Sequence, residues 1–298
     1  MKSFNGIIPA LMTPFDKSNR INESVLRELV ELNIDKGVAG FYVCGSSAEA
    51  FLMDLEERKQ ILEIVADQVA GRVQLICHVG NISTWSALEL AEHAKATGAD
   101  AISSIPPFYY KFTEAEIKAY YRELMAHIDL PMIIYNFPDF SGVSLNSSNA
   151  SDLFLEKQVM GIKHTSNDMF EIDKLKALSK EITVFSGYDE CWISALAMGA
   201  DGAIGSTYNV MAEKAISIQS LFQKGKIEEA RGIQSVLNRI IGTLIEVGVF
   251  SGLKYLMELQ GIDAGVCRSP FAPLTDRQKD MLKGVEPLLN HNSDAINE

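Results

Sequence analysis

Eight short apolar runs, each followed by helix-forming sequence, alternate along the first 225 residues of this chain. The runs are rich in valine and isoleucine and are bounded by glycine, proline or aspartate, which is typical of buried strands in a parallel sheet. Strict alternation of strands and helices indicates an α/β fold, and eight repeats fit a closed (β/α)8 TIM barrel. The predicted strands are 7–11, 40–44, 73–78, 101–105, 132–135, 159–163, 182–185 and 202–204.

The helices between the first strands carry recognisable start signals. Asp54 is a suitable N-cap with Glu57 three residues later, and Thr113 with Glu116 forms a capping-box pattern. The predicted helices are 23–35, 55–69, 84–97 and 114–126.

Three further helical stretches, 226–246, 252–260 and 275–288, follow the eighth strand and exceed what a barrel needs. We therefore expect residues 1–225 to form the barrel and 226–298 to form a C-terminal helical extension packed on it. No low-complexity linker separates the two parts. The polar tail from about residue 291 is expected to be disordered.

The composition limits the classes of partner. The 298 residues include 27 basic and 39 acidic side chains, a net charge of −12, which argues against a nucleic acid or an anionic membrane as partner. No apolar run approaches the length of a bilayer span, and the first residues do not read as a signal peptide. We expect a cytoplasmic protein that acts on a small molecule.

Metal and nucleotide motifs are missing from the sequence. The four cysteines form no CxxC pair, and Cys44 and Cys77 lie in apolar runs where buried thiols are expected. The five histidines show no ligand spacing, and there is neither a GxGxxG nor a GxxxxGK[ST] pattern. The sequence therefore predicts no metal site and no nucleotide cofactor.

Lys163 stands at the end of the sixth apolar run, where a barrel loop should begin. A poorly hydrated lysine favours its neutral amine, which can attack a carbonyl group. The alternative is a lysine that merely extends to solvent from the end of a strand. The catalytic interpretation gains weight because active sites of (β/α)8 barrels lie at these strand ends.

Other strand ends carry polar residues whose role is open in each case. Ser46 and Ser47 lie in a small-residue turn that could hold a carboxylate or be an ordinary serine-rich turn. Tyr135 could pack or act as a proton donor. Asp189 and Glu190 could accept hydrogen bonds from polyol hydroxyls. Asp189 could also cap the helix that follows it, and both roles could hold together.

One more strand end and the residue beside Lys163 complete this set. The eighth strand is followed by another hydroxyl-bearing loop, Ser206 and Thr207. His164 should point to the opposite face of its strand from Lys163, and we interpret it as structural.

Together these motifs resemble the pyruvate-dependent class I aldolases of the dihydrodipicolinate synthase and N-acetylneuraminate lyase superfamily, over residues 6–271. Within it the chain is most similar to the N-acetylneuraminate lyase branch. The superfamily motifs lie at 45–49, 106–110, 135–138, 161–163 and 205–207. The motifs of the branch lie at 141–143, 187–190, 205–209 and 248–254.

The resemblance implies roles for these residues. Lys163 would form a Schiff base with the keto carbon of pyruvate, and Tyr135 would transfer a proton. Ser46 and Ser47 would hold the carboxylate, and no cofactor would be needed. The residues implied to line the sugar-binding part of the cleft are Thr165, Gly187, Asp189, Glu190 and Ser206. Tyr109 matches a family tyrosine that reaches a neighbouring subunit's site, which implies a homotetramer.

Two positions bear on how closely the chain follows the patterns of the superfamily and its branches. The synthase branch typically carries an arginine near Phe140, and this chain has none there. Ala48 stands where the family usually has glycine, which would strain the turn if a positive φ were required. The expected reaction is reversible cleavage of N-acetylneuraminate to N-acetyl-D-mannosamine and pyruvate. The alternatives are another 2-oxo acid aldolase, such as dihydrodipicolinate synthase, and a non-catalytic sugar-acid sensor.

Overall fold

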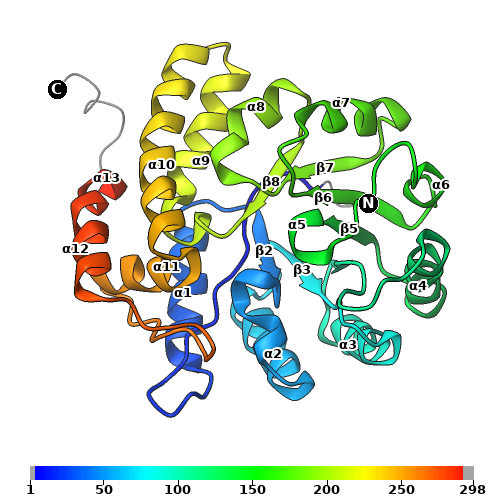
Figure 1. The fold of residues 1–298 in the computed structure, drawn as a ribbon, viewed down its shortest axis with the longest axis horizontal. Coiled ribbons are helices and arrows are strands. Elements are labelled where there is room, and N and C mark those ends of the chain that lie inside the picture. Colours follow the sequence, from blue (N-terminus) through cyan, green and yellow to red (C-terminus); the bar gives the residue numbers. More distant parts are fainter. Residues whose placement is uncertain (1–3, 291–298) are drawn as a thin grey trace.

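A ring of parallel strands surrounded by helices forms the centre of the molecule in the computed structural model, which describes residues 4–290 (Figure 1). Within these residues the sheet has eight strands, so the predicted (β/α)8 barrel is confirmed. The strands are β1 (Gly6–Pro9), β2 (Gly40–Val43), β3 (Gln74–His78), β4 (Ala101–Ser104), β5 (Met132–Asn136), β6 (Val159–His164), β7 (Thr183–Ser186) and β8 (Gly202–Gly205).

The ring closes between its first two strands. The hydrogen-bonded order runs from β1 through β8 and back along the sheet to β2. A parallel bridge between Ala10 and Tyr42 then joins β1 to β2, and the Ala39 amide donates to the Ile7 carbonyl over 2.9 Å. All C-terminal strand ends therefore meet at one mouth, where a barrel carries its site.

Most helices that follow the strands lie outside the ring, whereas α5 contributes Phe140 to the cavity at its mouth. Both predicted capping boxes are present, Asp54 with Glu57 at α2 and Thr113 with Glu116 at α4. The short helices α5 and α6, both within the connection after β5, were not predicted. The helices of the barrel are α1 (Glu23–Asp35), α2 (Leu55–Val69), α3 (Thr84–Thr97), α4 (Glu114–His127), α5 (Pro138–Ser141), α6 (Ser151–Phe154), α7 (Met169–Leu178), α8 (Trp192–Ala197) and α9 (Tyr208–Gln223).

The remaining helices lie together on one side of the barrel, at the left of Figure 1. They are α10 (Ile227–Val247), α11 (Val249–Leu259), α12 (Asp276–Val285) and α13 (Pro287–Asn290). The predicted helix 275–288 is divided into α12 and α13, because Pro287 has no amide hydrogen with which to continue a helix. We propose that these helices are an extension of the barrel, since they share its outer core. The predicted tail from about residue 291 lies outside the described residues.

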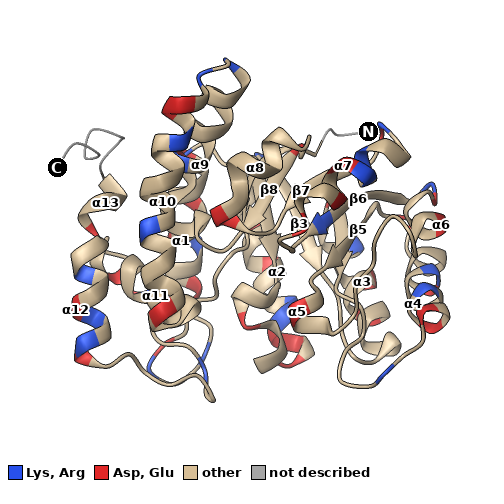
Figure 2. Cartoon of the chain, turned by 45° about the horizontal axis from the view of Figure 1, so that its top comes forward, with Lys and Arg blue, Asp and Glu red and all other residues tan. Residues whose placement is uncertain are grey.

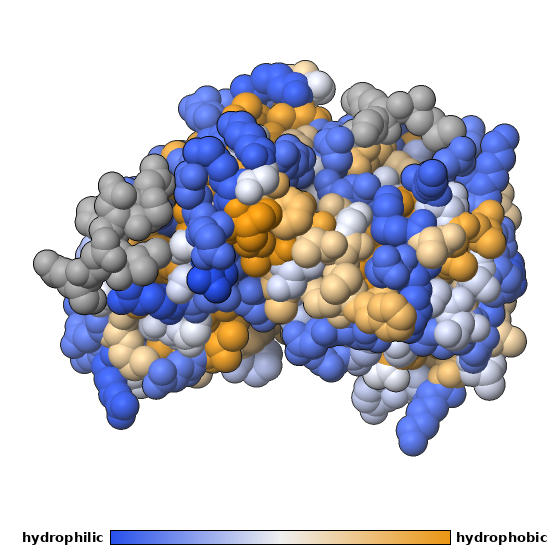
Figure 3. All heavy atoms as spheres, turned by 90° about the horizontal axis from the view of Figure 1, so that it is seen from above, coloured by the Kyte–Doolittle hydropathy of each residue, from blue (hydrophilic) through white to orange (hydrophobic). Residues whose placement is uncertain are grey.

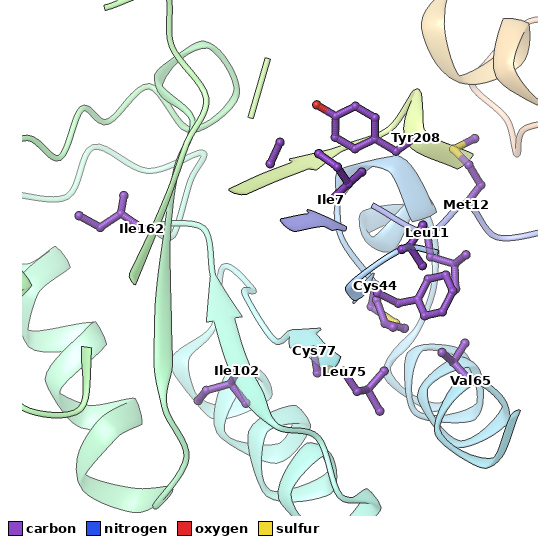
Figure 4. Close-up of a cluster of buried hydrophobic side chains, with 14 of the residues drawn as sticks. Ile7, Leu11, Met12, Cys44, Val65, Leu75, Cys77, Ile102, Ile162 and Tyr208 are labelled. Atoms are coloured by element: carbon purple, nitrogen blue, oxygen red, sulfur yellow. The ribbon is translucent and has the colours of Figure 1, made fainter. Parts of the chain in front are cut away.

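The core has two layers that follow the alternation of each strand. Ile8, Ile133 and Ile204 point into the barrel, whereas their neighbours point outward into the layer between strands and helices. Figure 4 shows part of this outer layer, including Ile162 of β6. Because Ile162 points outward, the next residue, Lys163, faces the interior.

Charged residues lie mainly on the outer helices and loops, and the strands are largely uncharged (Figure 2). On the face seen in Figure 3, hydrophobic side chains appear in patches between hydrophilic ones. Among the described residues, no single helix is long and apolar enough to cross a membrane. The pair α10 and α11 meets that test only when both helices are counted together, across a 120° bend.

Candidate active site

Lys163 lies inside the mouth of the barrel, between two aromatic residues of the neighbouring strands. It is in register with Tyr135 of β5 and Phe185 of β7. Its Nζ atom lies 3.8 Å from the centroid of the Tyr135 ring and 4.9 Å from that of Tyr42. Only 5% of the residue is exposed, so the lysine does not extend into bulk solvent.

A cavity of about 500 Å³ opens above Lys163 and is large enough for a sugar-sized ligand. The structure brings the predicted site residues together here, with the exception of Tyr109. Those that line the cavity are Ser46, Ser47, Tyr135, Lys163, Thr165, Gly187, Asp189, Glu190 and Ser206.

Several buried oxygen atoms in this cavity have no hydrogen-bond partner within the protein. They are Ser46 Oγ, Thr165 Oγ1 and Asp189 Oδ1. Buried polar groups are normally hydrogen-bonded, since an unpaired one costs about 1–3 kcal/mol. Their convergence on one cavity indicates a site built for a ligand with several polar groups.

The turn after β2 supplies the two serines. Residues Ser46–Ala48 form one turn of 3-10 helix, and the residues of positive φ are the flanking Cys44 (59°) and Glu49 (61°). Ala48 itself does not have a positive φ, so the strain considered for it from the sequence does not arise. The alanine is compatible with the observed turn.

Asp189 has its two carboxylate oxygens in different surroundings. Oδ2 accepts hydrogen bonds from the amide and the hydroxyl of Thr207, at 2.9 and 2.6 Å. Asp189 therefore binds Thr207, the residue at the start of α9. The sequence had suggested that Asp189 caps the helix that directly follows it in the chain. Burial raises the pKa of the carboxyl to about 6.

Two glycines allow these oxygens to lie close to the backbone. A Cβ atom at Gly205 would lie 1.6 Å from Asp189 Oδ1, and one at Gly187 would lie 1.8 Å from Thr165 Oγ1. Both positions therefore exclude any side chain while Asp189 and Thr165 keep their places. Gly187 shapes the cavity through its lack of a side chain.

A buried aromatic cluster lies beneath Lys163 and was not predicted. Tyr42 donates to Ser103 Oγ over 3.0 Å, and burial raises the pKa of its phenol well above the usual value. His78 Nδ1 lies 2.9 Å from the Cys44 carbonyl, and its Nε2 accepts from the Ile105 amide. Burial lowers the pKa of His78 well below the usual value, so the ring is neutral. These groups are fixed as a platform, which leaves Tyr135 as the phenol beside the amine.

The sequence model of the Dihydrodipicolinate synthetase family matches residues 3–286 of the chain. The chain belongs to this family. It is 41% identical to N-acetylneuraminate lyase 2 of Escherichia coli O6:H1 over 293 residues, 98% of this chain and 96% of the relative. The solved structure of CdNal from Clostridium difficile, in complex with mannosamine, has a TM-score of 0.93 and 38% identity, covering 96% of this chain and 99% of that one. A catalytic lysine mutant of the Ruminococcus gnavus sialic acid aldolase has a TM-score of 0.94 and 32% identity, covering 97% and 98%.

Two residues that the sequence analysis singled out, His164 and Tyr109, lie outside the cavity. His164 contacts Asn136 Nδ2 at 3.3 Å and the Asp168 carbonyl at 3.1 Å, on the outer side of the ring, as predicted for a structural residue. Tyr109 is 83% exposed and has a φ of 78°. Its ring contacts Tyr110 edge to face.

The outer wall of the cavity was largely missed by sequence reasoning. It is apolar, and much of it comes from α10, α11 and the segment before α12. The residues are Phe137, Phe140, Ile241, Ile245, Val249, Phe250 and Phe271. Phe140, Ile245 and Phe271 are exposed hydrophobic residues, but a sequence does not reveal which of its apolar residues will be exposed together.

The four cysteines are unpaired, and Cys44 and Cys77 are buried as predicted. Within residues 4–290 no cluster of three or more histidine, cysteine, aspartate or glutamate side chains is arranged to hold a metal ion.

Proposed function

We propose that this protein is a class I aldolase that reversibly cleaves N-acetylneuraminate into N-acetyl-D-mannosamine and pyruvate. One observation carries the proposal: a buried lysine faces a sugar-sized cavity into which unpartnered oxygens of Ser46, Thr165 and Asp189 converge. The names of relatives that match over nearly the whole chain support the same reaction.

In the proposed reaction the Lys163 amine adds to the keto carbon of the open-chain sugar acid. Loss of water then gives a protonated imine, which draws electrons from the bond between the third and fourth carbons. Tyr135, whose ring lies against the amine, takes the proton of the C4 hydroxyl. Ser46, Ser47 and the substrate carboxylate are the candidate relays for this proton. The sugar leaves as an aldehyde. The remaining enamine is protonated and hydrolysed to pyruvate, so the lysine itself supplies the electron sink and no metal or organic cofactor is required.

The binding roles are also proposals. Ser46 and Ser47 would hold the carboxylate of the substrate, next to the imine. Asp189 and Glu190, at the end of β7, would accept hydrogen bonds from sugar hydroxyls. The residues that would complete this subsite are Thr165, Gly187 and Ser206. The synthase branch needs a cation near Phe140 to bind the carboxylate of its second substrate, aspartate semialdehyde. Phe140 carries no charge, so the site favours a sugar as substrate.

We further propose a homotetramer in the cytoplasm. The exposed Tyr109, held at a strained φ of 78°, supports a role at a neighbouring subunit's site. The four unpaired cysteines are expected in a reducing compartment.

Pyruvate release from N-acetylneuraminate tests the proposal directly. Borohydride reduction in the presence of pyruvate should leave a mass adduct on Lys163, and Lys163→Ala should lose both the adduct and turnover. Lys224→Ala, at an exposed lysine outside the cavity, is the matched control. Turnover only of pyruvate with aspartate semialdehyde would identify a synthase instead. Binding of N-acetylneuraminate without any adduct would identify a sensor.

A further inference from the structure

A hydrogen bond across the mouth of the barrel joins the loops that follow β5 and β7. Tyr188 donates from its phenol to Asp139 Oδ2 over 2.7 Å. Asp139 lies in α5, and Tyr188 directly precedes Asp189 and Glu190. The bond therefore ties the loop after the Tyr135 strand to the loop that carries the two candidate sugar-binding carboxylates.

This bond stands at the outer end of a stack of aromatic rings that begins at Tyr135. The Tyr135 and Phe137 rings are stacked at 5.9 Å, and the Phe137 and Phe140 rings are stacked at 4.2 Å. Tyr188 meets Phe137 edge to face at 6.1 Å. Phe137, Phe140 and Tyr188 all line the cavity, so this stack forms one of its walls.

Helix α5 has little means of holding this wall by itself. It has only four residues, begins with Pro138 and has no side-chain N-cap. Such a short helix contains few internal hydrogen bonds, so its position depends on contacts with other elements. Phe140 is 56% exposed, which leaves its ring free to move if α5 moves.

The donor in this bond remains protonated under ordinary conditions. Burial, and then the hydrogen bond to Asp139, raises the pKa of the Tyr188 phenol, and the nearby charge of Glu190 acts in the same direction. The phenol therefore stays the donor of this bond, and an O–H donor on a carboxylate makes a strong type of hydrogen bond.

We propose that Tyr188 and Asp139 are positioning residues that hold α5 and the Phe137–Phe140 wall against the outer cavity, and so select a substrate longer than pyruvate. The inference rests on the proposed function and adds a determinant of its substrate preference. The Phe137 and Tyr135 rings stand between this bond and Lys163 of the inner site. Removing the bond should therefore weaken binding of the sugar part alone.

The test compares Tyr188→Phe, Asp139→Ala and the double variant with the parent protein. Each single variant should raise the KM for N-acetylneuraminate about fivefold with kcat changed less than about twofold, because a lost interaction common to ground and transition states appears in KM. The double variant should be no worse than either single variant, since both remove the same bond. The rate of borohydride trapping with pyruvate should stay at the parental level. Tyr255→Phe, at a tyrosine outside this cavity, is the control for loss of a hydroxyl.

Other results would overturn the inference. A parental KM in Tyr188→Phe would exclude a role for the bond, and a loss in Asp139→Ala alone would mean that the carboxylate contacts substrate itself. Equal losses in pyruvate trapping and sugar cleavage would indicate general damage to the site. A parent protein that traps pyruvate but does not cleave N-acetylneuraminate would overturn the proposed substrate, and this inference with it.

Discussion

Lys254 Nζ lies 2.8 Å from Glu49 Oε1, and both side chains are almost completely shielded from solvent, with 1% and 0% exposed. Glu49 directly follows the turn that carries Ser46 and Ser47, whereas Lys254 belongs to α11. The second Glu49 oxygen accepts from the Arg268 amide over 2.7 Å. The C-terminal extension therefore anchors the turn that we propose to bind the substrate carboxylate.

Lys254→Met should destabilise the protein strongly, because it leaves the Glu49 carboxylate buried without its partner. Removing one member of a buried ion pair costs about 3–5 kcal/mol. The free energy of unfolding, measured by urea denaturation, should fall accordingly.

The control for this prediction is Arg231→Ala, which removes a largely exposed ion pair with Glu228. Its unfolding midpoint should stay at the parental value. Adding Glu49→Gln to Lys254→Met should recover part of the lost stability, because the unpaired charge is then removed. A double variant less stable than Lys254→Met would contradict the assignment of the loss to that charge.

Gly205→Ala should damage the sugar subsite, since its Cβ would lie 1.6 Å from Asp189 Oδ1 and displace the carboxylate. A displacement of about 1 Å in a site can cost about 100-fold in rate, so we expect kcat/KM for N-acetylneuraminate to fall at least tenfold. Trapping with pyruvate should persist, because Lys163 is on another strand.

Gly242→Ala is the matched control for Gly205→Ala. Gly242 is helical, and a Cβ atom there would meet nothing within 4 Å. This variant should keep parental activity and gain slightly in stability, because alanine favours a helix over glycine. Parental kinetics in Gly205→Ala would show that Asp189 does not contribute to sugar binding.

The inner half of the site was predictable from the sequence because strand periodicity determines it. Once Ile162 is assigned to the outer core, Lys163 must face inward, and the barrel rule places it beside the ends of the other strands. The Glu49–Lys254 pair was not predictable, because its members are about two hundred residues apart and the motifs that contain them do not reveal that they meet. The same holds for Phe250 and Phe271, whose place in the cavity wall depends on how α11 packs on the barrel.

Tyr135→Phe should separate imine formation from carbon–carbon bond cleavage. The variant keeps the ring against Lys163 Nζ but loses the proposed proton-transfer group. General acid–base catalysis contributes about 10²–10⁴-fold, so kcat for N-acetylneuraminate should fall by that order. The Lys163 adduct with pyruvate should still form after borohydride reduction, and near-parental turnover would exclude Tyr135 as the base.

The raised pKa of Asp189 predicts opposite effects of pH on activity and on stability. Below about pH 6 the carboxyl is protonated, and a neutral carboxyl accepts hydrogen bonds from sugar hydroxyls more weakly than a carboxylate does. The kcat/KM for N-acetylneuraminate should therefore rise with pH through about 6, and Asp189→Asn should be weakly active without that inflection.

The free energy of unfolding should fall as the pH rises, because the folded protein binds this proton more tightly than the unfolded chain does. In the unfolded chain the pKa of the carboxyl is 3.8. The stabilising contribution is complete below pH 3.8 and is lost as the pH rises through about 6. At pH 8 the buried charge remains, so Asp189→Asn should be more stable than the parent by about 1–3 kcal/mol. Urea denaturation at pH 8 and at pH 5 should give a smaller difference at the lower pH. An equal difference at both would show that Asp189 is not the group that titrates.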